Sequence, residues 1–318
     1  MNLSELVGQP HAVGCLMRAL QSGRIGHAYL FAGPRGVGKR TAALAFARAL
    51  NCESPAGPGV SCGKCRPCEE IEKGIYPDLL MLGPEDEDGE RGYSFHTETI
   101  SVAAGWAALT AHTRRTKVCI LEDVHLMTPA AANHFLKMLE EPPPRTVWLL
   151  LTSEPGFLLP TIRSRCQPVR FVLLPRGAVA EIYRRQGREG GDEAAALGLG
   201  RVDLDPAEVG EAVKRATEAI GYAQKFDMAA LSGSMSAIRK DRVERLGGLL
   251  DGIELACADR LRHAVGTDPV RAADSDTWIA ALDAVARARW RLRHYMDRTM
   301  LDSLGADLAL ALGEKTGG

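Results

Sequence analysis

Short runs of consecutive apolar residues, separated by helical patterns, dominate the first half of the chain. Runs of this length, bounded by polar or glycine-containing segments, are typical of strands buried on both faces of a parallel sheet. The pattern predicts strands at residues 27–32, 78–82, 117–121, 147–151 and 169–173.

Apolar residues at helical spacing fill the segments between these runs. Residues 1–25 contain a short helix with Val13, Leu16, Met17 and Leu20 on one face, and residues 40–50 form another amphipathic helix. Thr128 and Pro129 are typical of a helix start, and the prolines at 142–144 end that helix. Alternating strands and helices predict an α/β fold with a parallel sheet up to about residue 174.

No strand is expected beyond residue 174. Loops at 187–191 and 203–206 separate short helices, and from about residue 222 the readable pattern is helical. One apolar stripe at helical spacing supports this prediction; it consists of Trp278, Leu282, Val285, Leu292 and Met296.

Composition narrows the class of protein. The 318 residues suggest two or three domains. The net charge of −1 gives the protein no overall positive electrostatic field that would attract nucleic acid. No apolar stretch has the ~18–20 residues that cross a membrane, and the N-terminus does not resemble a secretion signal. We therefore expect a cytoplasmic protein. Its eight cysteines would then stay reduced and serve metal binding or packing.

The sequence GPRGVGKRT, between a predicted strand and a predicted helix, has the spacing of a phosphate-binding loop. The backbone N–H groups of such loops surround phosphate oxygens, and the lysine reaches the β and γ phosphates. The next residue is normally Ser or Thr, whose hydroxyl helps to hold Mg²⁺, but here it is arginine. Phosphate binding without efficient hydrolysis is favoured over a plain glycine turn; the candidate residues are Gly33, Gly36, Gly38, Lys39 and Arg40.

Two acids, Glu122 and Asp123, follow the strand at 117–121. In nucleotide-hydrolysing sites an Asp there helps to hold Mg²⁺ and a following Glu orients the attacking water. The order is inverted here, so each carboxylate is displaced by one methylene. A solvated strand end is an equally good explanation of this pair taken alone.

Cys62, Cys65 and Cys68 form two C-x-x-C steps that share a cysteine, and Cys52 lies ten residues earlier. Four thiolates complete a tetrahedral structural zinc site with no open position for catalysis. Disulfides and iron–sulfur ligation are weaker alternatives. Cys15, Cys119 and Cys257 are expected to be core residues.

The segment TIRSRC follows the strand at 147–151 and contributes Arg163 and Arg165. A solvated charge is the simpler interpretation of either arginine. A guanidinium can also stabilise charge on the γ-phosphate of a neighbouring subunit.

These motifs together resemble bacterial clamp-loader subunits of the AAA+ superfamily. The matching stretches are VGQ, HAYLFAGPRGVGK, the cysteine cluster, LEDVHLM, NHFLKMLEEPPPRTVWLLLTSEP and TIRSRC, which run in order through residues 6–168. Hydrolysing gamma/tau subunits of this family have GKT or GKS in the phosphate-binding loop and the acid pair DE after the strand that corresponds to 117–121. The delta-prime type departs at both places while keeping Ser-Arg-Cys, and GKR with ED is more similar to it.

The resemblance implies an AAA+ nucleotide-binding-type domain at 1–172 with a zinc knuckle at 52–68, a helical lid at 173–221 and a helical collar at 222–318. It implies a place in a pentameric loader with gamma/tau motor subunits and a delta subunit, which opens a sliding clamp and closes it on primed DNA. Arg165 would act in trans on a neighbour's ATP. Ser153 or Thr152 would be the phosphate-sensing residue, and ATP would bind weakly or not at all in the chain's own site.

Two alternatives remain open: a hydrolysing gamma/tau-like motor of the same loader, and a stand-alone zinc-containing AAA+ helicase loader or recombination factor. Basic groups are interpreted first as solvated helix faces and second as contacts to DNA phosphates or acidic partners. They are Arg114, Arg115, Lys117, Arg239, Lys240, Arg242, Arg287, Arg289, Arg291 and Arg293.

Overall fold

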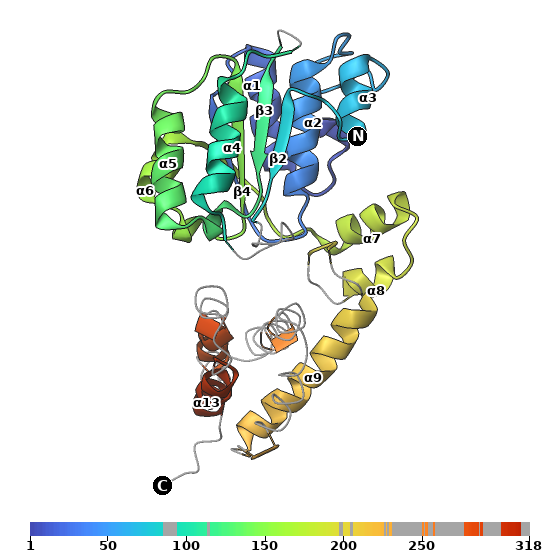
Figure 1. The fold of residues 1–318 in the computed structure, drawn as a ribbon. Coiled ribbons are helices and arrows are strands. Elements are labelled where there is room, and N and C mark those ends of the chain that lie inside the picture. The colour runs from blue at the N-terminus through green and yellow to red at the C-terminus, as the bar shows by residue number, and fades with distance from the viewer. Residues whose placement is uncertain are drawn as a thin grey trace. The chain divides into compact units, whose positions relative to one another are not determined.

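A computed structural model describes residues 1–84, 94–112, 115–196, 200–203, 206–225, 277–285 and 300–312, together with 227, 229, 230, 250, 252, 253, 257, 287 and 288 (Figure 1). The chain divides into two compact units, Met1–Asp203 and Leu204–Gly318. The three domain boundaries expected from the resemblance stay predictions. Within the described residues no helix is long and apolar enough to cross a membrane.

The first unit is built on a five-stranded sheet with the order β2-β3-β4-β1-β5, in which every neighbouring pair is parallel. The strands are β1 (Ala28–Ala32), β2 (Leu79–Leu82), β3 (Lys117–Leu121), β4 (Thr146–Thr152) and β5 (Gln167–Arg170). The predicted α/β fold with a parallel sheet is confirmed.

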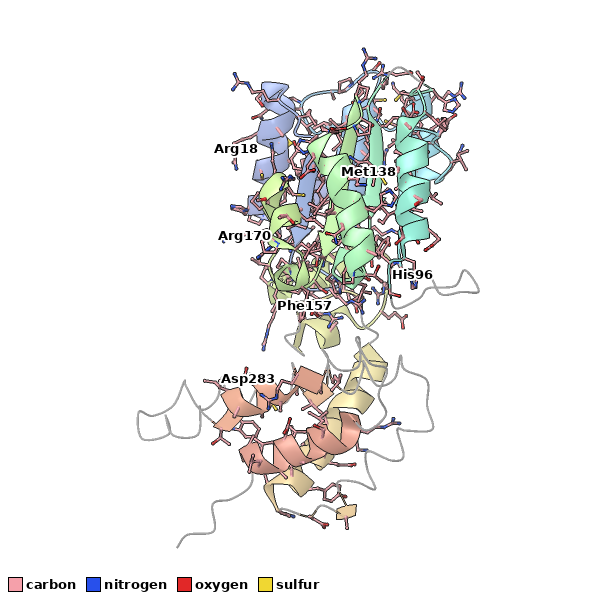
Figure 2. The ribbon with its side chains drawn as sticks, turned by 60° about the vertical axis from the view of Figure 1, so that its left-hand side comes forward. Arg18, His96, Met138, Phe157, Arg170 and Asp283 are labelled. Atoms are coloured by element: carbon pink, nitrogen blue, oxygen red, sulfur yellow. The ribbon has the colours of Figure 1, made fainter. Side chains whose placement is uncertain are left out.

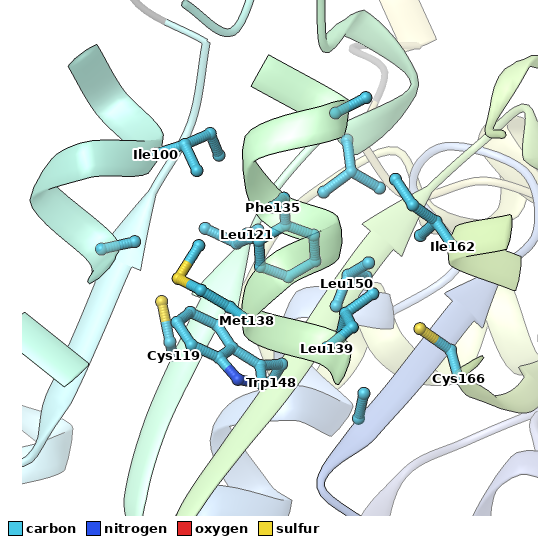
Figure 3. Close-up of a cluster of buried hydrophobic side chains, with 14 of the residues drawn as sticks. Ile100, Cys119, Leu121, Phe135, Met138, Leu139, Trp148, Leu150, Ile162 and Cys166 are labelled. Carbon is cyan, nitrogen blue, oxygen red and sulfur yellow. The ribbon is translucent and has the colours of Figure 1, made fainter. Parts of the chain in front are cut away.

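Successive residues of the central strands enter two different cores because side chains alternate across a sheet. Val147 and Leu149 of β4 pack with helices α1 (Pro10–Ser22) and α2 (Lys39–Asn51). Trp148 and Leu150 pack on the other face with α4 (Thr97–Ala108), α5 (Pro129–Glu140) and α6 (Pro160–Arg165) (Figure 3). Helices α4 and α5 contact each other over that face, with Met138 on α5 (Figure 2).

The predicted helix start at Thr128 is confirmed, since its side chain accepts a hydrogen bond from the Ala131 N–H at 3.2 Å. Helix α4 and the short helix α3 (Arg66–Glu72) were not predicted. Strand β5 begins two residues before the predicted 169 and ends at Arg170. Beyond it the Gln9 side chain replaces a strand partner, because it accepts from Val172 N at 3.1 Å and donates to Val172 O at 2.6 Å.

The elements described beyond β5 are helices, as predicted: α7 (Arg176–Arg185), α8 (Gly191–Ala196), α9 (Pro206–Gln224) and α13 (Met300–Leu312). In the second unit, buried Ala219 and Ile220 of α9 share a core with Leu304 and Leu308 of α13. The predicted stripe contributes Trp278, Leu282 and Val285 to this core. Its other members, Leu292 and Met296, lie outside the described residues.

Candidate functional site

The glycine loop joins β1 to α2, in the context that a phosphate-binding loop needs. Gly36 and Gly38 have φ angles of 66° and 95°, which L side chains rarely adopt, and α2 begins at Lys39. The N–H of Gly33 donates to the Thr152 carbonyl at 3.1 Å, which ties the loop to the end of β4. The curled backbone places the loop at the N-terminus of α2, where an anion is favoured.

Lys39 folds back onto this loop. Its Nζ donates to the Gly33 carbonyl at 2.6 Å and to the Pro34 carbonyl at 2.5 Å. Burial lowers the pKa of Lys39 to about 8, and the charge of Asp123 opposes this shift. The lysine therefore lies against the glycine loop, with two loop carbonyls as its partners.

Both acids after β3 are paired with arginines of the glycine loop. Arg40 lies with its Nε 3.5 Å from Glu122 Oε1, and Arg35 lies with its Nη2 3.1 Å from Asp123 Oδ2. The structure thus brings together the predicted residues Arg40, Glu122 and Asp123. It adds Arg35, which the sequence did not single out because its partner lies 88 residues away.

These residues do not fit the Mg²⁺ ion that a nucleotide-hydrolysing site of this type holds. Position 40 offers a guanidinium in place of a hydroxyl, and Thr41 is exposed. Glu122, at the position whose acid helps to hold the metal, already has Arg40 as a cationic partner. Asp123, at the position whose acid orients the attacking water, is paired with Arg35.

The end of β4 supplies two hydroxyls with different surroundings. Thr152 is fully buried, and its Oγ1 lies 3.2 Å from His125 Nδ1 and accepts from the Glu154 N–H at 3.0 Å. The Ser153 Oγ is buried and has no hydrogen-bond partner among the described residues. Of the two hydroxyls, that of Ser153 is therefore the one without a hydrogen-bond partner in the described part of the chain.

A segment that follows α8 lies against the glycine loop. The Val202 N–H donates to the Gly36 carbonyl at 2.9 Å, and a Cβ on Gly36 would lie 1.9 Å from Asp203 Oδ1. Arg201 holds the Asp203 carboxylate through two contacts of 3.1 and 2.9 Å. No sequence signal links these residues, because more than 160 positions separate them from the loop.

Arg165 is the last residue of α6, and its side chain is 36% exposed. Its Nη2 lies 2.8 Å from Glu140 Oε1, and its Nη1 donates to the Thr161 carbonyl at 3.1 Å. Within the described residues it makes no hydrogen bond or ion pair with the glycine loop. Arg163 is exposed and forms no ion pair with any of the described residues. Arg165 is thus the ordered arginine of the two candidates.

The four predicted metal ligands converge. The Sγ atoms of Cys52, Cys62, Cys65 and Cys68 all lie within 4.8 Å of one another. A tetrahedral Zn²⁺ site with Zn–S bonds of about 2.3 Å needs Sγ atoms roughly 3.8 Å apart. The observed separation of 4.0 Å between Cys52 and Cys65 is close to this value. Backbone N–H groups, that of Lys64 above all, lower the pKa of Cys62 to about 6 and favour the thiolate that binds a metal.

The surroundings of the cluster also fit a metal. Four thiolates around Zn²⁺ carry a net charge of −2, and buried Arg48 lies beside the cluster. Its Nη2 is 3.7 Å from the position of a Cβ on Gly63, and its buried Nε has no hydrogen-bond partner in the described part of the chain. Arg115 donates to the carbonyls of Asn51 and Cys52 at 3.3 and 3.0 Å. The cysteines can therefore hold one metal ion next to compensating positive charge.

The remaining cysteines and basic groups are mostly structural. Cys119, Cys166 and Cys257 are buried in the cores, and Cys15 is half-buried against the core that contains Tyr29 and Phe46. Lys117 is buried with its Nζ on the carbonyls of Trp106 and Leu109, and Arg287 lies 3.4 Å from Asp307. Lys117 therefore has no exposed charge for DNA. The other predicted basic positions except Arg115 lie outside the described residues: Arg114, Arg239, Lys240, Arg242, Arg289, Arg291 and Arg293.

Comparison with known proteins relates this site to DNA replication proteins. A family model described as "DNA polymerase III, delta subunit" matches residues 8–174. DNA polymerase III subunit gamma/tau of Mycobacterium tuberculosis is 37% identical over 58% of this chain and 32% of its own length. DNA polymerase III subunit delta' of Pseudomonas aeruginosa is 41% identical over 44% of this chain and 41% of its own length. The corresponding delta' subunit of Bacillus subtilis is 37% identical over 54% and 50%.

Among solved structures, a DNA polymerase III gamma subunit-related protein of Thermotoga maritima matches with a TM-score of 0.47 and 18% identity, over 94% of this chain and 98% of that one. The chain spans no more than half the length of the curated relatives named above. Residues 8–174, which the family model matches, contain the glycine loop, the cysteine cluster, the acid pair and Arg165. The chain therefore belongs to the DNA polymerase III delta subunit family, the clamp-loader family that its motifs resemble.

Proposed function

We propose that this chain is a non-hydrolysing subunit of the replicative clamp loader. It lends Arg165 to ATP held by a neighbouring motor subunit while the loader places a sliding clamp on primed DNA. Its partners in this proposal are gamma/tau motor subunits and a delta subunit in a pentameric ring. Its location is the cytoplasm, where that loader acts.

One observation carries the proposal: both acids after β3 are bound to arginines of the chain's own glycine loop. Hydrolysis of this type depends on Mg²⁺ to neutralise charge on the phosphates and on a carboxylate that orients water. With Arg40 in place of the hydroxyl and Glu122 and Asp123 paired, neither requirement is met. Any nucleotide in the site would bind weakly and remain intact.

Arg165, unlike the chain's own nucleotide site, has properties that suit a role in ATP hydrolysis. Arg165 is partly exposed and held in one orientation, as an arginine acting on a neighbour's phosphate must be. Such arginines contribute about 10³–10⁵ in rate in comparable nucleotide hydrolases. This supports Arg165 over Arg163 as the trans residue.

The test is ATP turnover by the reconstituted loader, stimulated by clamp and primed DNA. The unmodified chain, Lys39→Ala and Arg165→Ala would be compared, with Arg163→Ala as the matched control. We expect Lys39→Ala and Arg163→Ala to leave turnover unchanged and Arg165→Ala to slow it tenfold or more. A silent Arg165→Ala, or a loss with Lys39→Ala equal to one motor's share, contradicts the proposal.

A hydrolysing gamma/tau-like motor is the second candidate, because the loop glycines and Lys39 are intact and a gamma/tau relative matches over 58% of this chain. The Lys39→Ala arm of the same experiment separates this candidate from the first. No observation favours a stand-alone helicase loader or recombination factor.

We also propose that the cysteine cluster holds structural Zn²⁺. Four thiolates complete its coordination and leave no position for a reacting group. The metal would fix α3 and the chain around it against α2. Metal analysis of the purified protein tests this, with one equivalent of zinc expected and none after Cys62→Ser/Cys65→Ser.

A further inference from the structure

Arg165 is held by acceptors from two different helices. Its Nη1 donates to the Thr161 carbonyl within α6, and its Nη2 donates to the carboxylate of Glu140 at the end of α5. One contact would leave the guanidinium free to turn about it. Two contacts from separate helices fix both its position and its plane.

The backbone is anchored next to both charged residues. Leu139 precedes Glu140, Cys166 follows Arg165, and both belong to the buried cluster under α5 and α6. Figure 3 shows Leu139, Ile162 and Cys166 in this cluster. Because the neighbouring residues are packed, the distance between the two charged side chains is set by the core and not by a flexible loop.

Glu140 occupies a position that disfavours a carboxylate. It is the last residue of α5, where unsatisfied carbonyls give the helix end a partial negative charge. The prolines that begin at Pro142 end the helix there. The Arg165 guanidinium offsets this repulsion, so the carboxylate is explained by its pairing with Arg165 rather than by helix stability.

The arrangement leaves donors available for a ligand. A guanidinium has five N–H donors. The two contacts use one on each terminal nitrogen, which leaves the Nε–H and one N–H on each terminal nitrogen without a partner among the described residues. We propose that Glu140 is a positioning residue that orients these free donors toward the phosphate oxygens of ATP in the neighbouring subunit. This inference rests on the proposed function of Arg165.

The experiment is steady-state ATP turnover of the reconstituted loader, with clamp and primed DNA, as a function of ATP concentration. Glu140→Ala and Glu140→Gln would be made in the unmodified chain, and Glu140→Ala also in Arg165→Ala. Glu141→Ala is the matched control, because Glu141 is an adjacent exposed glutamate that forms no ion pair within the described residues.

We expect Glu140→Ala to lower kcat by about threefold to tenfold while KM for ATP is unchanged, because a misplaced arginine weakens only the transition state. Glu140→Gln should lose less, since its amide oxygen still accepts the hydrogen bond. Glu141→Ala should be silent, and Glu140→Ala should add nothing to Arg165→Ala.

The other outcomes overturn the inference in different ways. Normal turnover with Glu140→Ala, alongside slow turnover with Arg165→Ala, removes the role of Glu140 and leaves the proposed function intact. Faster turnover would mean that Glu140 restrains Arg165. An equal loss in the Arg165→Ala background would mean a purely structural role. A silent Arg165→Ala refutes the proposed function itself.

Discussion

Replacement of Arg48 by methionine should have opposite effects on the protein with and without zinc. The Arg48 side chain is only 9% exposed, and its ion pair with Glu72 is long, at 3.7 Å, and involves a carboxylate that is 63% exposed. Such a pair contributes at most about 1 kcal/mol. The buried charge therefore needs another anion, and the zinc–thiolate cluster beside it would carry a charge of −2.

The magnitudes follow from the two states. With zinc bound, loss of an outer-shell partner lowers metal affinity by about 10- to 100-fold, which corresponds to about 1.4–2.7 kcal/mol. Without zinc, Arg48→Met removes a poorly paired buried charge and should raise the free energy of unfolding by about 1–3 kcal/mol. Methionine keeps most of the side-chain volume, so no large cavity contributes to either value.

The assay combines zinc affinity, from competition with a chelating dye, with thermal unfolding of the zinc-loaded and zinc-free protein. Arg66→Met is the control, since Arg66 lies in the same knuckle but its side chain is 82% exposed and paired with Glu70. That variant should change neither measurement appreciably. The reasoning is refuted if Arg48→Met shifts the unfolding temperature equally, and in the same direction, in both forms.

Three further predictions concern the glycine loop. Burial lowers the pKa of Lys39 to about 8, below its unfolded value of about 10.4, so the unfolded chain binds more protons between these values. The free energy of unfolding should therefore rise with pH across this window relative to Lys39→Met, and parallel pH profiles in urea titrations would contradict this. Fluorescent ATP analogues should bind equally in Mg²⁺ and in EDTA, because Arg40 replaces the hydroxyl that would hold the metal and is paired with Glu122. A tenfold strengthening of binding by Mg²⁺ would refute that explanation. Gly36→Ala should lower the free energy of unfolding by roughly 2 kcal/mol, from its positive φ and the clash with Asp203. Asp203→Ala should recover part of this loss in urea unfolding, and no recovery would exclude the clash.

Much of the fold could be predicted because its signals are local. Consecutive apolar residues mark β3 and β4, whose residues are buried on both faces. Thr128 begins α5 through its own side chain. Helix α4 was missed because only Ile100, Ala103 and Ala107 are buried along it, and small alanines give weak contrast between its two faces. The end of β5 was misplaced because hydrogen bonds between the Gln9 side chain and the backbone of Val172 replace those of a neighbouring strand, and Gln9 lies 163 residues from Val172 in the sequence.

The sequence alone determined the spacing of the cysteines, the order of the glycine loop and the identity of Arg40, Glu122 and Asp123. These features depend on residues close together in the chain. Only the tertiary structure decided which charges meet: Arg35 with Asp123, Arg40 with Glu122, and Arg165 with Glu140. The physical reason is that parallel strands bring their carboxyl ends to one edge of the sheet and helices dock over its faces. Periodicity along the chain specifies the elements, whereas the order of strands specifies which side chains become neighbours.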